Sequence, residues 1–320
     1  MTIDSTAPQI IFGTSCLGNL YRVLSYETKR EIASEWFRAF SKPFIDSAGK
    51  YGAGLSLECI GRALKDLGKK PGDLTISVKL GWRRAPLLTP EPTFEPGAWA
   101  GLEHDAVQDI SVRGIRRCYD EARELLDGYP IDFVSVHDPD EYLAAGGAKE
   151  DILGAYETLF DLKTKGEVKA VGIGSKDWQT IRLLRKEGVA FDWAMFACAP
   201  TLLSHSTELL AFVRELQSEG VFLIDSAVFN GGFLMGSNKL DYREADPIAD
   251  AHAFLFREKY QSLCEKYKLD PAVPAVHYAF RLGFNAVALN TSSPQRIAQN
   301  AAYATAQVPT EFWTDLEKFL

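Results

Sequence analysis

Four ionisable side chains in the first half of the chain have the types needed for proton transfer to and from an oxygen: Asp46, Tyr51, Lys79 and His137. A phenol with an unperturbed pKa of about 10 is a poor proton donor and a poor base at neutral pH. A neighbouring ammonium favours the phenolate and lowers that pKa, and a carboxylate beside the ammonium keeps it charged. An imidazole on the far side can hydrogen-bond a carbonyl or hydroxyl and orient it. The four groups together suit reversible proton transfer to an oxygen whose carbon gains or loses hydride.

Each of these residues also has a structural interpretation. A lysine at the end of a strand is often solvated, and a histidine there can be a structural residue whose hydrogen bonds are satisfied. Asp46, which precedes Ser47-Ala48-Gly49, could form a turn, and Tyr51 could pack as an ordinary aromatic. The catalytic hypothesis therefore depends on whether the chain brings the four side chains together.

Short apolar runs predict the strands that would position these residues, and Asp46, Lys79 and His137 each close one of them. Most runs are apolar at both odd and even positions, as expected of parallel strands that are covered on both faces. The predicted strands are Ile10–Thr14, Phe44–Ala48, Leu74–Lys79, Asp132–His137, Val168–Ile173, Trp193–Ala197, Val221–Ile224 and Ala286–Leu289. The predicted helical segments are Tyr26–Phe40, Leu55–Leu67, Asp109–Leu126, Lys149–Lys165, Trp178–Glu187, Ser206–Ser218, Asp250–Leu282, Pro294–Ala302 and Thr310–Leu320.

Eight strand–helix units in alternation predict an α/β fold, a (β/α)8 TIM barrel that forms a single domain over residues 1–320. The active site of such a barrel lies at the carboxyl ends of its strands, where the second, third and fourth strands are neighbours. An open doubly wound sheet is the alternative, but the segment 13–19 lacks the GxGxxG spacing that this fold normally carries. Residues 81–109, rich in proline and aromatic residues, form a long loop after the third strand. We expect this loop to stand over the active site.

Composition argues against several classes of partner and location. A net charge of −8 and a pI near 5.3 disfavour nucleic acid and anionic membrane as main partners. The apolar runs are too short to span a bilayer, and residues 1–8 lack the features of a secretory signal. The five cysteines are scattered without a CxxC pair, which disfavours disulfides and a zinc site. We therefore expect a cytoplasmic protein without a metal; its oligomeric state is not predicted.

Four segments in the same order along the chain resemble motifs of the aldo-keto reductase family. They are Asp46–Gly52, with its Asp, short spacer and Tyr-Gly, the lysine strand Ile76–Leu80, the histidine strand Val134–Asp140 and the block Gly166–Ile173. The resemblance covers nearly the whole chain and implies the same eightfold barrel. It also implies that Tyr51 is the general acid/base, Lys79 perturbs its pKa, Asp46 partners the lysine and His137 orients the substrate.

The resemblance further implies an NAD or NADP cofactor extended across the barrel mouth without a Rossmann fingerprint. The segment Asn290–Asn300 resembles the family's adenosine-binding turn, and Asp225–Gly232 resembles its pyrophosphate loop. The implied cofactor residues are Ser175, Asp225, Ser226, Asn230, Gly231, Thr291, Ser293, Arg296, Gln299 and Asn300. Asn290 replaces a lysine common in NADP-preferring members, which favours NAD.

Three departures concern the nicotinamide pocket of the family. Gly174-Ser175 stands in place of the usual Ser-Asn pair, and the glutamine expected near Cys198 is absent. Asp225 replaces the aromatic residue that commonly stacks on nicotinamide.

The long loop and the residues after His137 look like a branch of the family that includes L-fucose dehydrogenase, D-threo-aldose 1-dehydrogenase and pyridoxal 4-dehydrogenase. This resemblance implies oxidation of a sugar or similar cyclic hemiacetal to a lactone. Aromatic platforms and carboxylates that accept hydroxyl hydrogens suit a sugar, and the residues expected to provide them are Trp82, Trp99, Asp138 and Asp140. Alternatively, Arg83-Arg84 would hold a substrate carboxylate or phosphate. A reductase of small aldehydes or keto sugars and a non-catalytic nucleotide-binding barrel remain as other functions.

Overall fold

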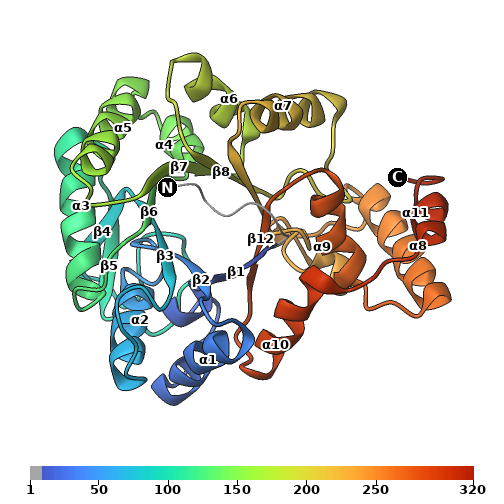
Figure 1. The fold of residues 1–320 in the computed structure, drawn as a ribbon, viewed down its shortest axis with the longest axis horizontal. Coiled ribbons are helices and arrows are strands. Elements are labelled where there is room, and N and C mark those ends of the chain that lie inside the picture. Colours follow the sequence, from blue (N-terminus) through green and yellow to red (C-terminus); the bar gives the residue numbers. More distant parts are fainter. Residues whose placement is uncertain (1–8) are drawn as a thin grey trace.

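Eight parallel strands close into one barrel in the computed structural model, which describes residues 9–320 (Figure 1). The order around the barrel is β1 (Gln9–Gly13), β2 (Phe44–Ala48), β3 (Thr75–Leu80), β6 (Phe133–His137), β7 (Ala170–Ser175), β8 (Trp193–Ala197), β9 (Phe222–Ser226) and β12 (Ala286–Asn290). The predicted barrel is confirmed, and the open sheet is wrong because β12 pairs with β1 and closes the ring. The strand bounds differ from the prediction by a residue or two.

Helices surround the barrel, and several of them begin at a side-chain cap. Ser25, Ser111, Asp177 and Ser206 each accept a hydrogen bond from a backbone N–H of the first turn that follows. The helices are α1 (Tyr26–Ala39), α2 (Leu55–Asp66), α3 (Val112–Leu125), α4 (Pro139–Ala144), α5 (Lys149–Thr164), α6 (Trp178–Lys186), α7 (Thr207–Ser218), α8 (Ala251–Tyr267), α9 (Ala272–Arg281), α10 (Gln295–Ala302) and α11 (Thr310–Leu316).

Two helical features differ from the prediction. The segment Asp250–Leu282 is two helices, because Lys268 takes the left-handed conformation at the end of α8 and Pro271 precedes α9. The short helix α4, which follows β6 directly, was not predicted. It places acidic residues beside His137.

Successive side chains of each strand point alternately into the barrel and toward the helices, so the strands separate two apolar layers. Trp193 and Met195 of β8 belong to the cluster inside the barrel, whereas Ala194 and Phe196 pack in the larger cluster between barrel and helices. A Cβ at Gly172 would stand 2.0 Å from the Trp193 indole. Glycine at this position is therefore required for the indole to fill the barrel.

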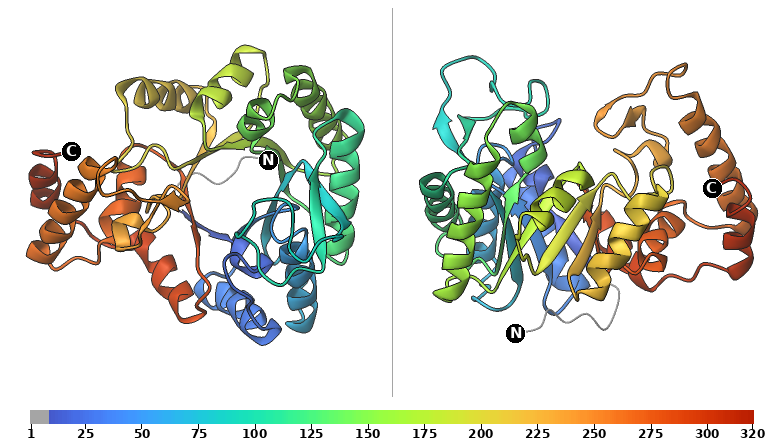
Figure 2. Two further views of the ribbon diagram at one scale, coloured as in Figure 1. Left: turned by 180° about the vertical axis from the view of Figure 1, so that it is seen from behind. Right: turned by 90° about the horizontal axis from the view of Figure 1, so that it is seen from above.

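The long connection after β3 is an ordered insertion. It contains the antiparallel pair β4 (Trp82–Pro86) and β5 (His104–Gln108), and its apolar side chains form a small separate core around Phe94, Trp99 and Leu102. In the right view of Figure 2 this insertion rises on one side of the barrel, and the loop that leads into α8 rises on the other. That loop follows the short pair β10 (Lys239–Leu240) and β11 (Arg243–Glu244).

Within residues 9–320, no helix combines the length and the hydrophobicity needed to cross a membrane. The residues 1–8, on which the expectation about a secretory signal rests, lie outside the described part of the chain.

Candidate active site

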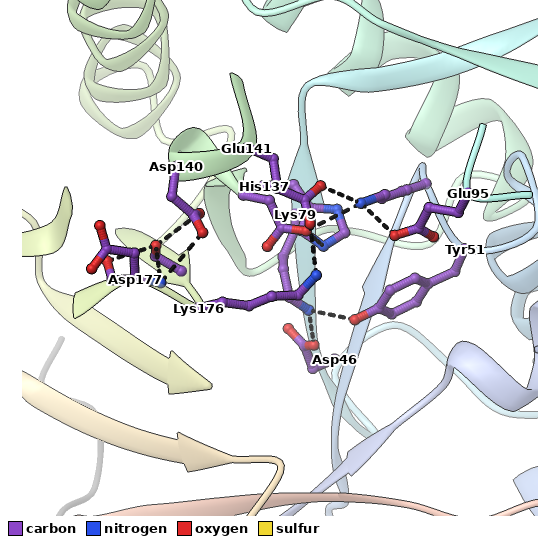
Figure 3. Close-up of polar contacts among 12 residues, drawn as sticks. Asp46, Tyr51, Lys79, Glu95, His137, Asp140, Glu141, Lys176 and Asp177 are labelled. Carbon is purple, nitrogen blue, oxygen red and sulfur yellow. Dashed lines mark hydrogen bonds and ion pairs between the residues drawn. The ribbon is translucent and has the colours of Figure 1, made fainter. Parts of the chain in front are cut away.

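The four predicted catalytic side chains meet at the carboxyl ends of neighbouring strands (Figure 3). Lys79 Nζ lies 3.2 Å from Tyr51 Oη and also donates a hydrogen bond to Asp46 Oδ2. The Tyr51 and His137 rings pack edge to face, with centroids 5.6 Å apart. Asp46, Lys79 and His137 are almost fully buried. The ammonium therefore lies between a carboxylate and a phenol, and the imidazole packs against the ring of that phenol.

Two glycines determine where Tyr51 stands. A Cβ at Gly18 would lie 2.6 Å from the Tyr51 carbonyl carbon, and a Cβ at Gly52 would lie 2.3 Å from Gly18 O. Gly52 also has a φ of +62°, which side chains of L-residues rarely adopt. The 3-10 helix η1 (Ser15–Gly18) and the turn after β2 can thus touch backbone to backbone, which holds the phenol over the barrel mouth.

Burial dominates the acidity of the tyrosine. It raises the pKa of Tyr51 above its ordinary value, and the nearby Lys79 ammonium lowers it only in part. Lys79 thus lowers the pKa of Tyr51 as expected, but its effect is smaller than that of burial. Burial also opposes the charge of Lys79, but attraction to Asp46 and Tyr51 raises the lysine pKa overall. The lysine is charged and the tyrosine is protonated at neutral pH.

His137 is neutral. Burial, together with the positive charges of Lys79 and Lys50, keeps the pKa of His137 well below its ordinary value. Its Nε2 lies 3.5 Å from Asp138 Oδ2, and Nδ1 has no hydrogen-bond partner among the described residues. Asp138 adopts the left-handed conformation at the start of α4. The imidazole is thus suited to hydrogen-bonding and not to carrying a permanent positive charge.

A second lysine, next to Tyr51 in the chain, lies buried in the same wall. Lys50 Nζ lies 2.8 Å from Glu95 Oε1, 2.7 Å from Glu141 Oε2 and 3.2 Å from Asp138 Oδ2. Burial disfavours its charge, yet the carboxylates of Asp138, Glu95 and Glu141 together raise the pKa of Lys50. Lys176 donates to the other oxygen of Glu141 at 2.6 Å. The wall therefore contains two ammonium groups and three carboxylates.

All of these groups except Glu141 line a cavity of about 820 Å³ at the barrel mouth. The cavity extends from the catalytic side chains to the turn before α10, past residues of β7 and of the loop after β9. Five of the predicted cofactor residues line it: Ser175, Ser226, Gly231, Thr291 and Arg296. Gly231 and its neighbour Gly232 both have positive φ values, so their backbone can approach a bound group closely.

The other five predicted cofactor residues do not line this cavity. Asp225 is fully buried, and because Ile224 and Ser226 face the barrel interior and the cavity, its side chain points toward the helices. It is not positioned to replace an aromatic residue on the nicotinamide. The remaining four have protein partners or are buried, namely Asn230 with Asp241, Ser293 with Gln295, Gln299 with Asp270, and Asn300 within α10.

Some of the predicted substrate residues line the cavity and others do not. Asp138 lines the cavity, but Trp82 does not; its ring packs against Phe94 and lies 5.0 Å from Lys50 Nζ. Trp99, the other expected aromatic platform, does line the cavity, and its ring lies 6.0 Å from the Tyr51 ring. Asp140 is also outside the lining and accepts a hydrogen bond from Ser175 Oγ at 2.8 Å. Asp140 therefore orients Ser175 from behind and is not placed to accept a substrate hydroxyl.

The two arginines proposed for an anionic substrate have protein partners outside the cavity lining. Arg83 Nε donates to Asp109 Oδ2 at 2.9 Å, and Arg84 Nη2 donates to Glu58 Oε2 at 2.5 Å. Neither guanidinium faces the cavity. The interpretation of Arg83-Arg84 as an anion clamp is wrong.

Several wall residues were missed by sequence reasoning, chiefly Lys50, Glu95, Glu141 and Lys176. A charged residue beside a tyrosine, or in a loop, reads as a solvated side chain. The one available signal was the position of Lys50 inside the motif that ends in Tyr51-Gly52. Among residues 9–320 no cluster of three or more histidine, cysteine or acidic side chains is arranged to hold a metal ion.

Comparisons with known proteins place the chain in a family of the same fold. The model of the aldo/keto reductase family matches residues 9–320. A pyridoxal 4-dehydrogenase of Microbacterium luteolum is 28% identical over 331 positions, covering 97% of this chain and 93% of that protein. A D-threo-aldose 1-dehydrogenase of a Pseudomonas species is 27% identical over 324 positions, with the same coverage, 97% and 93%.

Solved structures show the same barrel. A glycerol dehydrogenase from Gluconobacter oxydans superposes with a TM-score of 0.72 at 17% identity, covering 97% of this chain and 90% of that chain. A holo-form aldo-keto reductase from Bacillus halodurans gives a TM-score of 0.70 at 20% identity, covering 97% and 91%. At these identities the likeness concerns the fold.

Proposed function

The chain belongs to the aldo/keto reductase family, and on that premise we propose that it oxidises the anomeric carbon of a neutral sugar, or of a similar cyclic hemiacetal, to a lactone. The protein is an NAD(P)-dependent oxidoreductase related to aldose and pyridoxal dehydrogenases. The observation that carries the proposal is the contact of Tyr51 Oη with Lys79 Nζ inside a cavity walled by carboxylates.

Tyr51 acts as the base in this direction. A bound nicotinamide would supply the acceptor for the hydride of the anomeric carbon. Tyr51, as phenolate, takes the proton of the anomeric hydroxyl, so that the carbon–oxygen double bond of the lactone forms. Lys79 stabilises the phenolate by its charge, and Asp46 keeps that charge in place. His137, being neutral, hydrogen-bonds the reacting oxygen and orients it.

The residues present fit an extended dinucleotide. The cavity runs from Tyr51 to Arg296, and the left-handed Gly231 and Gly232 leave room for close contact with a pyrophosphate. Ser175, Ser226, Thr291 and Arg296 would hold the rest of the cofactor. We propose NAD in preference to NADP, because Asn290 carries no charge and its amide oxygen is already near Cys16 N, at 3.4 Å.

A neutral substrate suits the charges of the wall. All three donors of the Lys50 ammonium face carboxylates of the protein, so none remains for a substrate anion. Arg83 and Arg84 are paired elsewhere. Asp138 and Glu95 line the cavity as acceptors for hydroxyl hydrogens, and Trp99 offers an aromatic face.

The test combines a substrate panel with one substitution. Purified protein is titrated with NAD and with NADP, and turnover is then measured with a panel of aldoses and pyridoxal, and with small aldehydes in the reducing direction. We expect oxidation of an aldose, and we expect Tyr51→Phe to abolish turnover while the cofactor Kd changes by less than about threefold. Retained turnover in Tyr51→Phe would refute the role of the tyrosine. Activity confined to aldehyde reduction would favour the reductase function instead.

A further inference from the structure

We propose that Lys50 is a positioning residue that determines substrate selectivity: through Glu95 it fixes the 81–109 insertion against the active-site wall, and it thereby favours neutral polyhydroxylated substrates over simple aldehydes. The selectivity part rests on the proposed function. The anchoring part concerns the protein alone and is tested without a substrate.

Lys50 joins segments that are far apart in the sequence. Glu95 comes from the insertion after β3, whereas Asp138 and Glu141 lie at the start of α4, after β6. Lys50 and Glu141 are separated by 91 positions in the chain. The Lys50 side chain is only 2% exposed, and its ammonium also lies 5.0 Å from the Trp82 ring, at the base of the insertion.

Glu95 connects Lys50 to Trp99, the aromatic side chain of the cavity wall. One of its oxygens binds Lys50 and the other accepts a hydrogen bond from Trp99 Nε1 at 2.8 Å. Trp99 then packs beside Tyr51, with ring centroids 6.0 Å apart. The indole that borders the reacting phenol is therefore connected by two polar contacts to a lysine that touches neither the phenol oxygen nor Lys79.

The charges around Lys50 favour hydroxyl groups. Lys50 and Lys176 face three carboxylates, Glu95, Asp138 and Glu141, so the wall has an excess of one negative charge when all five are ionised. Each carboxylate oxygen can accept more than one hydrogen bond. A sugar offers several hydroxyl donors to such a wall, whereas a small aldehyde without hydroxyls offers none. An ordered carboxylate wall thus adds binding energy for polyols alone.

Replacing Lys50 with Met keeps an unbranched apolar stem but removes the cation that Glu95 shares with the buried Asp138, while Glu141 keeps Lys176. Such unpaired charges are strongly unfavourable, so Glu95 and its segment should move toward solvent. We expect backbone amides of residues 90–103 to exchange hydrogen for deuterium at least about tenfold faster in Lys50→Met than in the wild type. We expect kcat/KM for an aldose to fall about 100-fold, and kcat/KM for a small aldehyde to fall less than about fivefold.

Two further variants keep the test decisive. Glu95→Gln removes one charge while Lys50 keeps Asp138 and Glu141, so it should fold and show the same two changes to a smaller degree. Lys29→Met is the matched control, because Lys29 is equally buried, contacts Cys59 Sγ at 3.7 Å and lies outside the cavity lining. It should leave both the exchange of residues 90–103 and the substrate ratio unchanged.

The outcomes separate the two proposals. Unchanged exchange of residues 90–103 in Lys50→Met and Glu95→Gln would overturn the anchoring role, and equal loss for aldose and aldehyde would overturn the selectivity role. If the wild type oxidises no sugar, the proposed function fails, while the exchange measurement still decides whether Lys50 holds the insertion.

Discussion

Lys79 Nζ lies 3.2 Å from Tyr51 Oη in a buried site, and in the mechanism that we propose this contact governs the pH dependence of the reaction. Burial holds the pKa of Tyr51 above its ordinary value despite the lysine, so the phenolate needed for oxidation becomes more populated as the pH rises. We predict that kcat/KM for oxidation increases with pH through the alkaline range. The reverse reduction needs the phenol and should be flat near neutrality, falling only at higher pH.

The matching substitution is Lys79→Met. Without the ammonium, no charge offsets the rise that burial causes in the pKa of Tyr51. The alkaline limb of the oxidation profile should therefore move to higher pH, and kcat should fall by a factor of about 10²–10⁴. His137 should add no acidic limb between pH 6 and 8, because its pKa is kept well below its ordinary value. Profiles of kcat/KM in both directions would check this. Oxidation that slows from pH 7 to 9 would contradict the proton-transfer role of the pair.

A second prediction concerns the backbone contact that supports Tyr51. In Gly18→Ala the new Cβ would stand 2.6 Å from the Tyr51 carbonyl carbon, so the turn that carries the phenol must shift. We expect kcat to fall about 10- to 100-fold, since a displacement of an ångström can cost that much. We also expect a destabilisation of about 1–3 kcal/mol from overpacking.

Gly154→Ala makes the same chemical change in α5, where the new Cβ meets only the Val112 Cγ2 methyl at 2.8 Å. It should leave kcat unchanged, and alanine in a helix interior should hold or raise Tm. Steady-state kinetics and thermal unfolding of the two variants provide the measurement. Wild-type kcat in Gly18→Ala would show that the turn tolerates the shift.

The sequence was sufficient to predict the barrel and the meeting of Asp46, Tyr51, Lys79 and His137, because buried parallel strands are visible as apolar runs. Asp46, Lys79 and His137 close three such runs, and parallel strands bring their carboxyl ends to one edge. Asp225 shows the limit of this argument. Side chains alternate along a strand, so one residue at its end faces the cavity and the next faces the helices. A run that is apolar at both odd and even positions does not show which residue faces which way.

The charged residues of the cavity wall could not be predicted from the sequence for a different reason. Lys50, Glu95 and Glu141 are distant in sequence and look like solvated charges one by one. They meet only when the insertion folds back over the mouth and α4 follows β6 directly. Both Trp82 and Trp99 were expected at the cavity and only Trp99 lines it, because the sequence does not show how the antiparallel pair β4–β5 folds.

A third prediction addresses the choice between NAD and NADP. Introducing the cation that NADP-preferring relatives often carry, Asn290→Lys, should strengthen NADP binding by about tenfold and leave NAD binding nearly unchanged. Arg22 is the residue that could reverse the expected preference, because its Nη2 lies 2.5 Å from Ser292 Oγ at the same turn. Arg22→Ala should alter the Kd for NAD by less than about twofold. Tighter binding of NADP than NAD in the wild type, lost in Arg22→Ala, would contradict the proposed preference.

The last prediction concerns anionic substrates. Because the wall around Lys50 has more carboxylates than ammonium groups, a sugar phosphate or a uronic acid should be oxidised about 100-fold less efficiently than the matching neutral aldose. Raising the ionic strength from about 50 to about 500 mM should narrow this difference, since salt screens the repulsion at the open mouth.

Arg83→Ala distinguishes this explanation from an anion clamp. Arg83 pairs with Asp109 outside the cavity lining, so its removal should leave the ratio of neutral to anionic substrate unchanged. A clamp would instead make the anionic substrate the better one and would lose that advantage in Arg83→Ala. Measurements of kcat/KM for one neutral and one anionic sugar, at two ionic strengths in both proteins, separate the two explanations.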